Sequence, residues 1–72
     1  MAIQQSDLEN WFTYHAPGSD DLVAYEKLRN AGKDFAKAIN ELCPDSADKT
    51  AAIRKVREAV MTANASIACK GK

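Results

Sequence analysis

Five residues of this 72-residue chain could together bind a small anionic ligand that contains planar rings. Tyr14, His15 and Pro17 lie in one short stretch, and Arg29 and Lys70 lie further along the chain. A tyrosine ring can stack on a nucleobase, and a guanidinium can hold a phosphate through two parallel hydrogen bonds. His15 and the backbone N–H groups of a helix start would add donors for an anion. The pattern favours a site for a nucleotide-like ligand.

Three of these residues, and Tyr25, which is expected near the same end of the hairpin, also have an ordinary structural role open to them. Tyr14 could pack a short first helix against the rest of the chain, and His15 could lie at the surface or cap a helix. Tyr25 falls on an apolar helical seam, where its ring would belong to the packing. Arg29 follows Glu26 by three residues, so a surface ion pair would also account for it. The residue types alone leave both interpretations open.

The composition argues against three other kinds of site. Ten basic residues balance ten acidic residues, whereas proteins that bind nucleic-acid polymers normally carry a basic surplus. One His and two distant Cys give poor spacing for zinc, so no metal or cofactor is expected. No nucleophile has a base beside it, and a helix start explains the acidic pair at residues 20–21. We expect no nucleic-acid polymer, no metal and no enzymatic activity.

The sequence also bears on the cellular compartment. The start, Met1 to Ser6, lacks the basic and apolar segments of a signal peptide, and no apolar stretch is long enough to span a membrane. Cys43 and Cys69 are expected at opposite ends of a helical hairpin, roughly 35 Å apart. A disulfide needs Cα atoms within about 7 Å, so both thiols should be free. Free thiols fit a reducing cytoplasm, and we expect a cytoplasmic protein.

Helix signals divide the chain into three segments, and no segment alternates like a strand. Ser6 with Glu9 three residues later forms a capping box, which predicts a short helix ending near residue 12 or 13. Ser19 is expected to cap a second helix that runs to residue 42 or 43, before Pro44. Asp45 or Ser46 is expected to cap a third helix that runs to residue 68 or 69. The expected fold is all-α.

Apolar residues recur at steps of three and four in both long helices, as in a coiled-coil-like pair. The second and third helices should therefore form a long antiparallel hairpin, with the short N-terminal helix beside it, as a single domain over residues 1–72. The expected partners across the hairpin are Ile39 with Ile53, Phe35 with Val56, Gly32 with Val60, Leu28 with Ala63, and Tyr25 with Ile67.

The hairpin does not use all of the apolar residues. Many alanines and Met61 fall off the seam and form a small-residue surface suited to close packing against other copies. A chain of this length buries only about 60% of the surface that its unfolded form exposes, so its own core is marginal. We therefore expect a homo-oligomer.

Four segments, in this order and at these spacings, resemble the phage anti-CBASS sponge family, whose helical-hairpin domain also occurs in an anti-Thoeris sponge. They are FTYHAP at 12–17, YEKLR at 25–29, NELCPDS at 40–46 and REAVMTANASIA at 57–68. The resemblance covers nearly the whole chain. It implies a non-catalytic sponge that sequesters cyclic oligonucleotide messengers of bacterial defence, such as the cyclic dinucleotide 3′,3′-cGAMP or cyclic trinucleotides, in the infected cell.

The resemblance also implies how such a sponge is built. Members assemble as hexamers with ligand pockets between protomers. By the family's pattern Tyr14 would stack on a base, Arg29 would meet phosphate, and Lys70 would add positive charge; Asn64 and Met61 are candidates for a second site. The anti-Thoeris branch binds a cyclic ADP-ribose derivative, and that ligand stays open. A helical protein-interaction module without a nucleotide is the alternative that the residues themselves leave.

Overall fold

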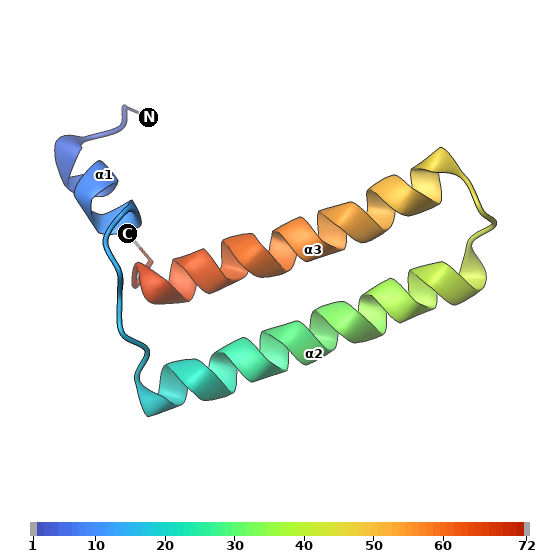
Figure 1. Ribbon diagram of the computed structural model, residues 1–72, viewed down its shortest axis with the longest axis horizontal. Helices are drawn as coiled ribbons and strands as arrows, with labels where there is room; N and C mark the ends of the chain where they lie inside the picture. Colours follow the sequence, from blue (N-terminus) through green and yellow to red (C-terminus); the bar gives the residue numbers. More distant parts are fainter. Residues whose placement is uncertain (1, 72) are drawn as a thin grey trace.

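The computed structural model describes residues 2–71, which form three helices (Figure 1): α1 (Gln5–Trp11), α2 (Ser19–Leu42) and α3 (Ala47–Ala68). α2 and α3 pack side by side and antiparallel, joined by a short turn at residues 43–46. α1 lies at the open end of this hairpin, next to the end of α3. None of the described residues belongs to a strand. The predicted all-α class and the predicted hairpin are confirmed.

Two of the predicted helix caps are wrong. α1 begins at Gln5 and α2 begins at Ser19, so the predicted caps Ser6 and Ser19 lie inside the helices, and the N-cap residues are Gln4 and Gly18. In both helices a carboxylate at the third helical position accepts a hydrogen bond from the N-cap backbone: Gln4 N–H to Asp7 Oδ2 at 2.9 Å and Gly18 N–H to Asp21 Oδ2 at 3.0 Å. A charged acceptor at a helix N-terminus is favoured over a hydroxyl by the helix dipole. The position at which each helix begins is therefore determined by its Asp residue.

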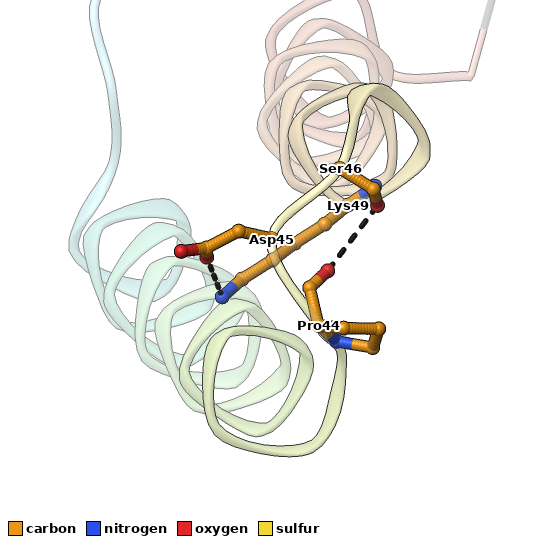
Figure 2. Close-up of polar contacts among 4 residues, drawn as sticks. All are labelled: Pro44, Asp45, Ser46 and Lys49. Carbon is orange, nitrogen blue, oxygen red and sulfur yellow. Dashed lines mark hydrogen bonds and ion pairs between the residues drawn. The ribbon is translucent and has the colours of Figure 1, made fainter.

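The turn between the long helices is closed by local contacts (Figure 2). Of the two predicted caps, Asp45 and Ser46, it is Ser46 that caps α3: its Oγ accepts from the Lys49 backbone N–H at 3.1 Å and donates to the Pro44 carbonyl at 3.2 Å. Lys49 Nζ also lies 2.9 Å from Asp45 Oδ1. The hydrogen bond from Lys49, and then its positive charge, lower the pKa of Asp45. These contacts fix the point at which the chain reverses.

The two long helices approach most closely where Gly32 faces Val60. A Cβ atom added to Gly32 would lie 2.4 Å from Val60 Cγ2 and 3.8 Å from Val56 Cγ1. Such a contact is far inside the van der Waals distance between carbons, so only glycine fits here. The predicted pairing of Gly32 with Val60 is confirmed. Phe35, placed by the sequence in the same seam, leaves 61% of its side chain exposed.

The hairpin is an open layer rather than a packed core. No side chain among residues 2–71 is fully buried. The radius of gyration is 15.2 Å, whereas a compact chain of this length would have about 11 Å. The apolar stripes of α2 and α3 are therefore only partly covered by each other. Both broad faces of the layer remain accessible in the single chain.

Hydrogen bonds centred on Asn10 hold α1 at the open end of the hairpin. Asn10 Nδ2 donates to the Cys69 carbonyl at 3.4 Å, and the Asn10 carbonyl accepts from the Cys69 thiol at 3.9 Å. The same carbonyl lies 2.7 Å from His15 Nε2. Thr13 Oγ1 donates to the Glu9 carbonyl and closes the end of α1. Asn10 thus joins α1, the following loop and the end of α3.

Replacing Gly32 by alanine should destabilise the protein, although alanine is the better helix former. The added methyl overpacks against Val60, which costs about 1–3 kcal/mol, and the gain in helix propensity is only about 1 kcal/mol. Urea unfolding at equal protomer concentration measures the difference. In a Val60→Ala background the Gly32→Ala change should become neutral or stabilising. An increase in stability in the wild-type background would contradict the close approach.

Replacing Asn10 by alanine should loosen α1 and leave the hairpin intact. Loss of one hydrogen bond of about 0.5–1.5 kcal/mol corresponds to about two- to tenfold faster hydrogen exchange of the affected amides. Exchange measured by mass spectrometry should rise in residues 5–15 and stay unchanged in residues 25–60. Gln5→Ala, an exposed position in α1, is the matched control. Equal protection in all three proteins would show that Asn10 does not hold α1.

Candidate ligand-binding groove

A groove with polar and charged walls opens on one face of the hairpin, toward its open end. Its volume is about 720 Å³. On each helix the lining residues follow the spacing i, i+3, i+4 and i+7, so their side chains share one face. α2 contributes Leu22, Tyr25, Glu26 and Arg29, and α3 contributes Met61, Asn64, Ala65 and Ala68. We call this hollow the polar groove.

Arg29 is the residue of the polar groove best suited to an anion. Its side chain is exposed. Within residues 2–71 the only ion pair joins Asp45 and Lys49, so the ion pair with Glu26 that the sequence allowed is not formed. A guanidinium stays charged at all physiological pH values and offers several donors in one plane. Arg29 can therefore take a phosphate, while Glu26 adds one opposing charge to the same groove.

The polar groove continues along the hairpin into a second hollow of about 260 Å³. Arg29 and Met61 line both hollows, and Lys33 and Arg57 line the second. Three basic side chains therefore lie along this face, although the second hollow itself presents almost no polar surface. Neither Lys33 nor Arg57 was among the site residues predicted from the sequence. The four-residue spacing of Arg29 and Lys33, which places them on one helical face, was the signal that could have found Lys33.

The structure separates the predicted site residues in the single chain. Arg29 lines the polar groove, whereas Tyr14, His15, Pro17 and Lys70, all within the described part of the chain, do not. Tyr14 lies in the loop between α1 and α2 with 84% of its side chain exposed. Lys70 follows α3 in a left-handed conformation (φ 56°) and is also exposed. Their part in ligand binding remains a prediction.

His15 has a structural role in the single chain. Its ring is half-buried, and its Nε2 lies 2.7 Å from the Asn10 carbonyl, within hydrogen-bond distance. The bond connects the loop to the end of α1, directly beside Tyr14. His15 therefore helps to determine the path of the loop that carries Tyr14, which is the structural alternative that the sequence left open.

The other face of the hairpin carries a groove of opposite character, with a volume of about 580 Å³ and almost no polar surface. Gly32, Val56 and Val60 lie at the seam and line hollows on both faces. We call the hollow of about 580 Å³ the apolar groove. Its chemistry suits apolar side chains and not a charged ligand. Its other lining residues are Leu28, Ala31, Phe35, Ile39, Ala52, Lys55, Ala59 and Ala63.

Two further searches of the described residues bear on the kind of site. No group of His, Cys, Asp or Glu side chains in residues 2–71 is arranged to hold a metal ion. Over the same residues, each helix is either too short or too polar to cross a membrane.

A comparison with protein families identifies the chain. The model of the Acb2/Tad1 hairpin domain matches residues 4–68, a range that contains all three helices. Comparisons with curated proteins and with solved structures give no match. The match confirms the resemblance found in the sequence, and the family is one of ligand-binding sponges rather than enzymes. The chain belongs to the Acb2/Tad1 hairpin family of anti-CBASS and anti-Thoeris sponges.

Proposed function

We propose that this protein is a phage-encoded sponge that sequesters cyclic oligonucleotide messengers of bacterial CBASS defence without cleaving them. Cyclic dinucleotides such as 3′,3′-cGAMP are the first ligands to consider, and cyclic trinucleotides are the next. The observation that carries the proposal is the family match across α1, α2 and α3. Membership implies immune evasion by binding, and the ligand named here goes beyond it.

The polar groove supports a phosphate-containing ligand. Its volume of about 720 Å³ lies within the range of about 300–1,000 Å³ that is usual for small-molecule sites. Arg29 has no ion-pair partner among the described residues, and Lys33 and Arg57 line the hollow that adjoins the groove. A cyclic dinucleotide carries two phosphates, so more than one basic side chain is needed. In this proposal Arg29 binds phosphate and Lys70 adds charge from the nearby end of α3.

We also propose that the active form is a homo-oligomer, with six copies as the expected number. The single chain has no buried side chain among residues 2–71, and Tyr14 is 84% exposed. A chain this small needs an additional source of stability, which apolar contact between copies would supply. Tyr14, His15 and Pro17 of one copy would then close the polar groove of another. The base would stack on Tyr14 while Arg29 holds the phosphate.

Two alternatives remain distinct from this proposal. A cyclic ADP-ribose derivative also combines an adenine ring with phosphates, so the same groove chemistry would suit it. The second is a protein-interaction module, and the apolar groove, with Phe35 61% exposed, is the observation that favours it. The first alternative keeps the sponge and changes the ligand, whereas the second removes the nucleotide altogether.

Calorimetry with a panel of cyclic di- and trinucleotides and cyclic ADP-ribose isomers tests the proposed function. We expect heat of binding with at least one cyclic dinucleotide, and intact ligand after heat denaturation of the complex, because the groove holds charge without catalytic groups. Native mass spectrometry of the same complex gives the number of copies and ligands. Absence of heat with the whole panel would favour the interaction module, and a cleaved product would overturn the sponge.

Substitutions at the two principal residues test the proposed site. Tyr14→Ala should weaken binding by about 1–3 kcal/mol for each base that loses its stacking partner. Arg29→Ala should weaken binding more at low salt than at high salt, because screening already reduces its charge interaction in salt. Lys27→Ala, which removes an exposed charge outside the lining of the polar groove, is the matched control. Unchanged affinity in both variants would place the site elsewhere.

A further inference from the structure

Tyr14 is tied to α1 from both sides. The residue before it, Thr13, donates a hydrogen bond from its Oγ1 to the Glu9 carbonyl, and the residue after it, His15, places its Nε2 2.7 Å from the Asn10 carbonyl. Both carbonyls belong to the last turn of α1. A carbonyl oxygen only accepts, so Nε2 carries the hydrogen in the second contact. The backbone of Tyr14 therefore moves together with α1 unless these bonds break.

α1 itself meets the hairpin at a loosely packed junction. It has seven residues, and a helix of this length is not stable alone in water. The Asn10 side chain donates to the Cys69 carbonyl at 3.4 Å, and the Cys69 thiol donates to the Asn10 carbonyl at 3.9 Å. Trp11 is 45% exposed and lines, with Cys69, a hollow of about 320 Å³ beside α3. The docking of α1 on α3 therefore depends in large part on the carboxamide of Asn10.

We propose that Asn10 is a positioning residue, which determines the affinity for the cyclic nucleotide by holding Tyr14 in place. This inference rests on the proposed function, in which Tyr14 stacks on a base. Asn10 is not among the residues that line the polar groove, and its Nδ2 and its carbonyl are bonded within its own chain. When α1 leaves α3, Tyr14 leaves its place relative to the hairpin, whichever copy's groove it closes. Only molecules with docked α1 then bind fully, and the apparent affinity falls with their fraction.

Replacing Asn10 by alanine separates this role from a direct contact with the nucleotide. The backbone carbonyl stays, so its bond to His15 is kept, while the bond from the side chain to Cys69 is lost. The Kd should rise about two- to tenfold, the effect of one hydrogen bond at a marginal junction. This loss should vanish in a Tyr14→Ala background, because Asn10 acts through that ring. By linkage, saturating nucleotide should dock α1 again in the Asn10→Ala variant.

Calorimetry with 3′,3′-cGAMP compares wild type, Asn10→Ala, Tyr14→Ala, the double variant and the control Gln5→Ala, an exposed position in α1. We expect weaker binding in Asn10→Ala than in wild type, no further loss in the double variant relative to Tyr14→Ala, and unchanged binding in Gln5→Ala. Hydrogen exchange of residues 5–11 in Asn10→Ala should return to the wild-type rate when the nucleotide is bound. This second measurement tests the proposal even where Tyr14→Ala abolishes measurable binding.

The outcomes separate the positioning role from the proposed function. Unchanged affinity in Asn10→Ala, an equal loss in both backgrounds, or exchange that the nucleotide does not slow overturns the positioning role while the proposed function stands. Fewer copies of Asn10→Ala in native mass spectrometry would assign Asn10 to contact between copies and also overturn that role. A member of the panel that binds in place of 3′,3′-cGAMP becomes the probe, and a wild type that binds no cyclic nucleotide overturns both.

Discussion

The close approach of Gly32 to Val60 determines how near the two long helices lie and how they are rotated about their axes. A Cβ on Gly32 would be only 2.4 Å from Val60 Cγ2, so the approach depends on glycine. Val56 and Val60 lie at the same seam and form part of the floor of hollows on both faces. The apolar groove and the smaller hollow that adjoins the polar groove therefore share this contact, and a wider helix separation would alter both.

The two faces divide two kinds of chemistry between them. Arg29, Lys33 and Arg57 lie along one face, where the polar groove has both polar and apolar walls and the adjoining hollow is lined mainly by the apolar parts of its side chains. The opposite face is almost wholly apolar and suits contact with other apolar side chains. Sequestration requires tight binding and no proton transfer, so a groove of this kind needs enclosure more than it needs reactive groups. An open two-helix layer cannot supply that enclosure alone, which is why we place the complete site between copies.

The short helix α1 acts on the loop that follows it rather than on the groove directly. Asn10 joins α1 to Cys69 across 59 positions of sequence, and the Asn10 carbonyl also lies within hydrogen-bond distance of His15. Tyr14 is thereby carried on a loop tied at both sides and yet stays exposed. This arrangement presents an aromatic ring away from its own chain. Such a ring is available to a ligand or to a second copy without prior rearrangement.

The sequence by itself determined the three helices, the end of α2 and the pairing of Gly32 with Val60, and it limited the cap of α3 to Asp45 or Ser46, because periodicity and helix signals are local and repeat along the chain. It misplaced the first two caps, because Asp7 and Asp21 accept hydrogen bonds from the backbone N–H groups of Gln4 and Gly18, and each helix therefore starts earlier than a Ser cap implies. Only the tertiary structure showed that Lys33 and Arg57 lie along the same face as Arg29, that His15 lies against Asn10, and that Asn10 joins α1 to Cys69. Those facts depend on the rotation of each helix and on contacts between distant segments, which no local pattern encodes.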